Sequence, residues 1–186
     1  MSHQPKVSNS SGGFNIPKQK RIKESSSEES IATYFEKVYG DEAVEALNVF
    51  TWGSNEMGQL GQEIENTTTK DKDGYSYSAQ PISLSSLNHL RVCWVSAGDG
   101  HTVSVSKNGM VFSWGASACG QLGLERIETM PRDAEGYPYQ PFPMQVKLLG
   151  NVKVKEISCG DAHSIALTID GKLFSWGGAG CGQLVS

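Results

Sequence analysis

The chain has 186 residues, of which 38% are hydrophobic, and its 16 Lys and Arg residues are outnumbered by 20 Asp and Glu residues. The formal net charge of -4 excludes the overall basic field with which a protein follows a phosphate backbone, and no apolar run approaches the roughly 20 residues of a membrane span. We therefore expect one soluble, intracellular domain plus a tail, in the cytoplasm, the nucleus or both, with no membrane partner.

Residues 1–30 are rich in Ser, Lys, Gln and Pro and contain almost no large apolar side chains. Such a segment cannot bury enough surface to offset the entropy of ordering, so we predict a disordered tail. Inside it, a short basic cluster precedes serines and glutamates at 25–29, an arrangement typical of an import signal tuned by phosphorylation. The candidate import residues are Lys18, Lys20, Arg21 and Lys23. A solvated tail without a function and a weak organellar transit peptide are the alternatives.

Residues 31–47 carry apolar side chains at helical spacing, with Gly40 as an interruption. These side chains are Ile31, Tyr34, Phe35 and Val38. The spacing predicts a short amphipathic helix that is marginal on its own and is available to cap the folded domain or to bind a partner.

From residue 48 onward, the sequence repeats with a period of 62 residues. Trp52-Gly53, Trp114-Gly115 and Trp176-Gly177 keep this offset, and the same offset carries the Gly-Gln-Leu-Gly run at 58–61 onto 120–123. We predict copies at about 48–94, 95–156 and 157–186.

Each copy contains a strong hairpin signal, such as the Asn108-Gly109 pair between two apolar runs. Asn-Gly favours a two-residue type I′ turn, which would place Val105 opposite Phe112 and Val103 opposite Trp114. The later copy, with Asp170-Gly171, would pair its strands in the same way. This register predicts one bulky and one small face for each hairpin, with Ser104 and Ser113 on the small face.

Every period therefore supplies several short strands and no convincing long helix. Small sheets that repeat and bury both faces against their neighbours are typical of a propeller. We predict an all-β fold, an incomplete β-propeller of about three repeats over 48–186. A β-sandwich with duplicated motifs is the alternative.

Two pairs of titratable residues recur in one loop of the repeat, Asp99 with His101 and Asp161 with His163. A carboxylate two residues from an imidazole has the composition of an acid-base pair. Active sites are usually unique, however, whereas a residue that returns in every period is more often structural. We expect the imidazoles to tie strand ends to neighbouring backbone carbonyls.

The long loops at 63–79 and 125–141 each contain a Gly-Tyr-x-Tyr run. Tyrosines exposed on a loop are common anchors of protein interfaces, and the alternative is that these rings pack the loop onto the rim of the sheet. The candidate residues are Tyr75, Tyr77, Tyr137 and Tyr139.

The sequence lacks several motifs that indicate metal binding, disulfide bonds or catalysis. The four cysteines form no CxxC pair, which argues against a zinc knuckle and a disulfide framework, and we expect reduced, buried thiols. They are Cys93, Cys119, Cys159 and Cys181. The GxxxxGK[ST], HExxH and GxSxG motifs are also missing, so we expect no hydrolase, no metal, no cofactor and no small-molecule substrate.

The stretch Val-Ser-Ala-Gly-Asp-Gly-His-Thr at 95–102, followed by Asn108-Gly109, Trp114-Gly115 and Gly-Gln-Leu-Gly at 120–123, resembles the regulator-of-chromosome-condensation repeat. The resemblance covers about residues 48–186 and implies a propeller of seven blades with four antiparallel strands each. This chain holds two full periods with a partial unit at each end. It is expected to be a truncated form of a longer protein, or a domain that completes itself on another chain.

The resemblance implies a non-catalytic protein-interaction module. The best-known member of the family is a guanine nucleotide exchange factor for the small GTPase Ran, and acidic and histidine side chains from such loops contact the GTPase, which places Asp99 first among the candidates. Exchange on Ran or a related GTPase is therefore the alternative function, and a fragment of a ubiquitin ligase is a third. Some members carry a basic N-terminal arm associated with import and chromatin contact, so chromatin is a weaker candidate partner.

Overall fold

The computed structural model describes residues 49–62 and 69–184. The predicted tail at 1–30, with the import candidates Lys18, Lys20, Arg21 and Lys23, lies outside the described residues. The predicted helix at 31–47 lies outside them as well.

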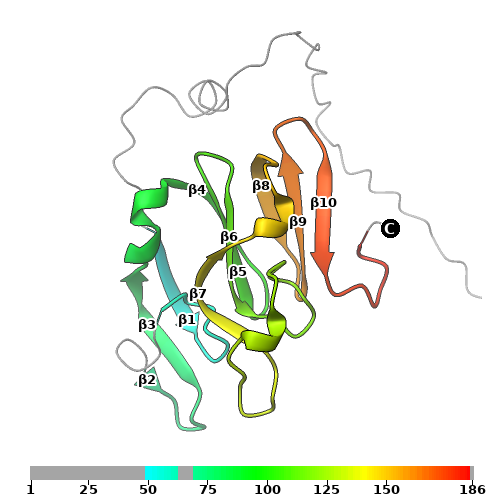
Figure 1. The fold of residues 1–186 in the computed structure, drawn as a ribbon. Coiled ribbons are helices and arrows are strands. Elements are labelled where there is room, and N and C mark those ends of the chain that lie inside the picture. Colours follow the sequence, from blue (N-terminus) through cyan, green and yellow to red (C-terminus); the bar gives the residue numbers. More distant parts are fainter. Residues whose placement is uncertain (1–48, 63–68, 185–186) are drawn as a thin grey trace, which may run out of the picture.

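Three antiparallel sheets follow one another along the chain (Figure 1). The first sheet has the order β1-β3-β2, with β1 at Phe50–Ser54, β2 at Thr69–Lys70 and β3 at Ser76–Ser83. The second has the order β4-β5-β6-β7, with strands at Val92–Ala97, His101–Ser106, Val111–Ala116 and Tyr139–Gln145. The third has the order β10-β9-β8, with β8 at Val154–Cys159, β9 at His163–Thr168 and β10 at Leu173–Gly177. Two short 3-10 helices, η1 at Ser85–Leu90 and η3 at Lys147–Leu149, connect consecutive sheets, and a third, η2 at Ile127–Thr129, lies between β6 and β7.

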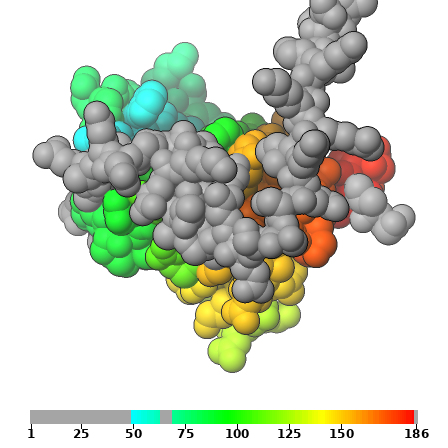
Figure 2. Space-filling view, turned by 90° about the horizontal axis from the view of Figure 1, so that it is seen from above, coloured from blue at the N-terminus to red at the C-terminus, as the bar shows by residue number. Residues whose placement is uncertain are grey.

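The sheets stand side by side, as the view from above also shows in the succession from cyan and green to orange and red (Figure 2). Consecutive sheets that cover each other are the arrangement of propeller blades, whereas a sandwich has two facing sheets. The second sheet is a complete four-stranded blade, and the first and third sheets are parts of blades within the described residues. The prediction of an all-β, incomplete β-propeller is confirmed.

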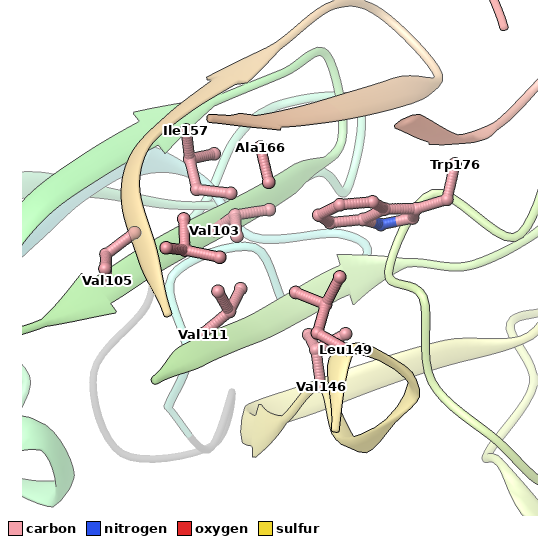
Figure 3. Close-up of a cluster of buried hydrophobic side chains, with 9 residues drawn as sticks. Val103, Val105, Val111, Val146, Leu149, Ile157, Ala166 and Trp176 are labelled. Carbon is pink, nitrogen blue, oxygen red and sulfur yellow. The ribbon is translucent and has the colours of Figure 1, made fainter. Parts of the chain in front are cut away.

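The hydrophobic core lies at the two junctions between sheets. Between the first and second sheets, Trp114 is fully buried against Leu84, Leu87 and Val92. Between the second and third sheets, a larger cluster includes Trp176 (Figure 3). Its buried members are Val103, Val105, Val111, Val146, Leu149, Val154, Ile157, Ala166 and Trp176. The core is thus divided into slabs, one for each pair of neighbouring sheets.

The predicted register of the hairpins is wrong by one residue. Val105 pairs with Val111 and Ser104 with Phe112. The loop has three residues, because the Ser106 N–H binds the Met110 carbonyl at 2.9 Å and Gly109 adopts a φ of +74°. In this three-residue loop, a turn is followed by a residue in the left-handed conformation. An Asn-Gly pair fits such a loop as well as it fits the two-residue turn. The β9–β10 hairpin shows the same shift, with Leu167 opposite Leu173.

The corrected register changes which side chains share a face. Val103, Val105 and Val111 lie together and face the third sheet. Trp114 and Phe112 lie on the opposite face, toward the first sheet. Both faces of the hairpin are therefore bulky, and the predicted division into a bulky and a small face is wrong.

All four cysteines are free thiols. Cys93 and Cys159 are partly buried, and burial raises the pKa of both thiols. Cys119 and Cys181 are exposed, so the prediction of four buried thiols is wrong for these two. Both directly precede the glycine of a surface turn, which explains their exposure.

Candidate functional site

The sheets have two ends of different construction. One end, which we call the loop end, carries the β4–β5 loop at 98–100 and the β8–β9 loop at 160–162. The segments that lead from β1 to β3 and from β6 to β7 also lie there. The loop end lies at the bottom of Figure 1. The opposite end, which we call the turn end, carries the β5–β6 and β9–β10 turns together with η1 and η3. All the aspartates, histidines and tyrosines predicted as candidates lie at or next to the loop end.

His101 is fully buried at the start of β5 and bonds to the neighbouring sheet. Its Nε2 lies 3.0 Å from the Ser164 hydroxyl of the third sheet, and that hydroxyl donates to the Gln121 carbonyl at 2.9 Å. Because the hydroxyl proton goes to the carbonyl, the imidazole Nε2–H is the donor toward Ser164. The imidazole therefore reaches a backbone carbonyl only through a hydroxyl, and its Nδ1 has no partner among the described residues.

The charge state of His101 follows from its burial. Burial lowers the pKa of His101 to about 4; the nearby His163 also lowers it, and Asp99 raises it. The imidazole is neutral at neutral pH, and its Nε2–H is occupied by Ser164. This geometry fits a structural bond between sheets, whereas an acid-base catalyst needs a pKa near the working pH and an accessible proton. His163, one period later at the start of β9, is partly buried.

One backbone carbonyl ties each sheet to the next. The Gln59 carbonyl accepts from the Trp114 indole N–H at 2.9 Å and from the Thr102 hydroxyl at 3.0 Å. One period later, the Gln121 carbonyl accepts from the Trp176 indole at 2.9 Å and from Ser164. The repeated tryptophan is thus a structural donor.

The Gln side chain in the same turn holds the turn closed. Gln59 Oε1 accepts from the Met57 N–H at 2.9 Å, and Gln121 Oε1 accepts from the Cys119 N–H at 2.9 Å. Our sequence reasoning assigned only the glycines of Gly-Gln-Leu-Gly and missed this double role of glutamine. The signal that could have found it is the constant separation between the acceptor and its two donors, 43 and 55 residues at both junctions.

Asp99 and Asp161 are exposed in the equivalent loops after β4 and β8. Close contacts shape the first of these loops, because a Cβ on Gly98 would collide with the Gly160 carbonyl and with the His101 ring. Asp99 lines a hollow of about 370 Å³ between the first and second sheets, beside Trp52, which is 63% exposed. This hollow lies where the first sheet, within the described residues, has no strands equivalent to β4 and β5.

Tyr75 and Tyr137 are held outward by two equivalent turns, and each is 55% exposed. The Asp71 carboxylate accepts from the Tyr75 N–H at 2.9 Å, and the Asp133 carboxylate accepts from the Tyr137 N–H at 2.7 Å. Our sequence reasoning missed these two aspartates. Tyr77 and Tyr139 lie on β3 and β7 and are partly buried. The first pair of rings is therefore exposed, as an interface anchor must be, and the second pair is partly buried.

The loop end is acidic. Its described turns and loops, at 55–62, 69–75, 98–100, 117–138 and 160–162, contain nine carboxylates and four basic side chains. The carboxylates belong to Glu56, Asp71, Asp73, Asp99, Glu125, Glu128, Asp133, Glu135 and Asp161, and the basic side chains to Lys70, Lys72, Arg126 and Arg132.

Over the described ranges, no group of three or more His, Cys, Asp or Glu side chains is arranged to hold a metal ion. In the same part of the chain, no helix is both long enough and apolar enough to cross a membrane.

Comparisons with known proteins identify the repeat. The model of the Regulator of chromosome condensation (RCC1) repeat matches residues 48–105 and 108–167, and a second model of that repeat matches residues 92–121 and 154–183. The chain is 38% identical over 135 residues to the human "Probable E3 ubiquitin-protein ligase HERC3" and 34% identical over 137 residues to the "Ultraviolet-B receptor UVR8" of Arabidopsis thaliana. Both matches cover 73% of this chain but only 11% of HERC3 and 27% of UVR8.

Among solved structures, Prp20p from Saccharomyces cerevisiae superposes with a TM-score of 0.56 at 26% identity. The match covers 70% of this chain and 29% of Prp20p, a protein whose structure was described together with its binding properties to Gsp1p and histones.

Proposed function

Since this chain belongs to the family of proteins built from Regulator of chromosome condensation (RCC1) repeats, we propose that it is a protein-interaction module whose loop end docks a protein partner without catalysing a reaction. The observation that carries the proposal is the separation of roles at this end. His101 is fully buried and bonded to the next sheet, whereas Asp99, Asp161, Tyr75 and Tyr137 are exposed. These four exposed side chains form no bond between sheets among the described residues and are therefore available to contact a partner.

The exposed tyrosines supply the apolar part of this surface. A tyrosine ring offers a large contact area and loses little conformational entropy on binding, because it has only two side-chain torsions. The Asp71 and Asp133 turns fix the backbone of both tyrosines before a partner arrives. Preorganisation of this kind lowers the cost of association.

The acidic charge of the loop end indicates a partner with a basic surface. Charges on the rim of an interface mainly raise the rate of association and reject partners of like charge. We expect binding to weaken as the salt concentration rises.

Photo-crosslinking tests this proposal directly. A photoreactive amino acid in place of Tyr137 should form an adduct with one specific protein in cell extract, and excess unlabelled chain should compete the adduct away. The matched control carries the same photoreactive residue in place of Phe142, which is 42% exposed in the middle of β7, away from both ends. Adducts of equal yield and identity from both positions, or none from Tyr137, would count against a loop-end docking surface.

Guanine nucleotide exchange on Ran or a related small GTPase is the second candidate function. It is favoured by the similarity to Prp20p, whose binding to Gsp1p has been described. Release of labelled GDP from Ran should then accelerate in the presence of the chain, and an Asp99→Ala variant should lose the acceleration. Asp170→Ala, which removes an exposed carboxylate in the β9–β10 turn at the opposite end, is the control. Binding of Ran without release would support the interaction module alone.

The histones of the Prp20p study make chromatin a further candidate partner. The acidic loop end suits basic histones, whereas the net charge of -4 is unfavourable for contact with DNA, so the support is weaker. HERC3 is a probable ubiquitin ligase, but the chain spans only 11% of it, and no observation on the described residues favours a ligase role.

For the cellular location, we keep the nucleus and the cytoplasm as proposals. Replacement of Lys20, Arg21 and Lys23 by alanine should shift a fluorescently tagged chain toward the cytoplasm. An unchanged distribution would remove the import signal.

A further inference from the structure

The turn end has the opposite charge to the loop end. Its described residues, at 84–92, 107–110, 146–156 and 169–172, contain six basic side chains and two carboxylates. The basic residues are Arg91, Lys107, Lys147, Lys153, Lys155 and Lys172, and the carboxylates belong to Glu156 and Asp170.

Both carboxylates are already engaged by neighbours at this end. Glu156 pairs with Lys155 at 3.2 Å, and Asp170 pairs with Lys172 at 2.8 Å and also binds the Thr168 hydroxyl. Arg91, Lys107, Lys147 and Lys153 have no carboxylate partner within the described ranges. Four positive charges therefore face solvent without a counter-charge from this part of the chain.

Backbone hydrogen bonds join these residues into one arc across the sheets. The Lys107 N–H donates to the Arg91 carbonyl at 2.8 Å, and the Val154 N–H donates to the Gly109 carbonyl at 3.1 Å. The Ile169 N–H donates to the Lys153 carbonyl at 3.0 Å. The basic arc, defined as Arg91, Lys107 and Lys153, is thus held in place by the strands and turns that carry it.

A pocket of about 320 Å³ adjoins the arc between residues 151–153 and the β9–β10 turn. Val152, Ile169 and Phe174 line it with apolar surface, and Lys153 and Lys172 contribute to its wall. Asn151 and Asp170 complete the lining. The pocket has room for one apolar side chain, flanked by ammonium groups.

Leu148 extends the apolar surface at this end. It lies on η3 and is 67% exposed. Apolar side chains beside positive charges suit a peptide that combines carboxylates with large apolar residues.

We propose that the turn end is a second interaction surface, which binds an acidic peptide segment of a partner protein through the basic arc and places one apolar side chain of that segment in the adjoining pocket. The surface differs from the loop end in position, charge and occupant.

A peptide fits this surface better than a nucleic acid does. A nucleic acid would meet Glu156 and Asp170 along its phosphates and would gain little from an apolar pocket. The net charge of -4 and the acidic loop end would also repel a long polyanion. A short peptide can bind within the arc alone.

The test uses the full chain and a short fluorescein-labelled peptide of glutamates with one central leucine. Fluorescence anisotropy should show saturable binding that weakens with salt, and a peptide with glutamine at the central position should bind more weakly. In the Lys107→Glu, Lys153→Glu double variant the affinity should fall about tenfold or more, because two attractive charges become repulsive.

The matched control is the Lys70→Glu, Lys72→Glu double variant, which changes the net charge by the same amount at the loop end. Its affinity for the peptide should stay within about twofold, because these lysines lie at the far end of the sheets, beyond the screening length of physiological salt. Thermal melting of both variants should match that of the parent chain, so that a loss of binding is not a loss of fold.

Three results would overturn the proposal. The first is no binding of the acidic peptide at low salt. The second is an equal loss in both double variants, which would show general electrostatics only. The third is tighter binding of a DNA or RNA oligonucleotide than of the peptide, abolished by Lys107→Glu and Lys153→Glu, which would make a nucleic acid the occupant.

Discussion

The junctions between the sheets and the turn end use the repeat in opposite ways. At the junctions, Gln59, Thr102 and Trp114 recur one period later as Gln121, Ser164 and Trp176 with nearly the same distances. The turn end keeps the repeat loosely, because Lys107 of the β5–β6 turn becomes Ile169 in the β9–β10 turn. The loop end keeps it, since Tyr75 and Asp99 recur as Tyr137 and Asp161, and there burial separates scaffold residues from those available for recognition.

His101 shows why this difference matters for assigning function. The imidazole and the adjacent carboxylate of Asp99 share one loop motif, but one is fully buried in a junction and the other is exposed at the loop end. A motif can thus combine a scaffold residue with a surface residue only two positions apart. If the comparison is correct, substitutions at the junctions change stability, and substitutions at the ends change binding.

The largest effect is expected for Trp114→Ala. Trp114 is fully buried and donates to Gln59, so its loss should lower the free energy of unfolding by about 3–5 kcal/mol. Trp52→Ala removes the equivalent residue of the first copy, which is 63% exposed, and should cost less than about 1 kcal/mol. Urea denaturation of both variants measures the contrast. Equal losses of unfolding free energy in the two variants would contradict the distinction between the buried Trp114 and the exposed Trp52.

The next effect concerns pH. The pKa of His101 is about 4 in the folded chain and near 6.5 when the chain is unfolded. Between these values the unfolded chain binds more protons, so the free energy of unfolding should fall as the pH is lowered from 6.5 to 4, by up to about 3 kcal/mol. A His101→Gln variant should lack this part of the slope. Parallel pH profiles for the two proteins would show that His101 is not buried in its neutral form.

A smaller contrast is expected within the junctions. Thr102→Val removes one donor to the Gln59 carbonyl, which still accepts from Trp114, so the cost should be about 1 kcal/mol. Ser164→Ala also leaves the buried Nε2–H of His101 without an acceptor, and the cost should rise to about 2 kcal/mol. Thermal denaturation of both variants checks this order. A reversed order would contradict the link from His101 through Ser164 to Gln121.

The smallest effect on stability is expected at the ends. Asp99→Ala and Arg91→Ala remove exposed charges that form no ion pair within the described residues, so the free energy of unfolding should stay within about 0.5 kcal/mol of the parent value. Denaturation curves that coincide with that of the parent chain would support the assignment of both residues to the exposed ends and not to the junctions. A loss above about 2 kcal/mol for either variant would place that residue in the scaffold.

Much of the fold could be predicted from the sequence, because the 62-residue offset is preserved in the residues that build the junctions. The hairpin register could not, since an Asn-Gly pair fits two loop lengths and only the packing of Val105 and Trp114 on opposite faces decides between them. The Gln59 carbonyl was missed because a backbone acceptor leaves no direct mark in a sequence. The charge difference between the two ends was missed because it depends on which loops share an end.

Hydrogen exchange at the tryptophan indoles, followed by NMR, tests most directly whether repeated tryptophans hold stacked sheets together. Slow exchange is expected for the Trp114 and Trp176 indole N–H groups, which are buried and bonded to the Gln59 and Gln121 carbonyls, and fast exchange is expected for Trp52. Equal, fast exchange at all three positions would contradict the stacking of the sheets and every assignment that depends on it.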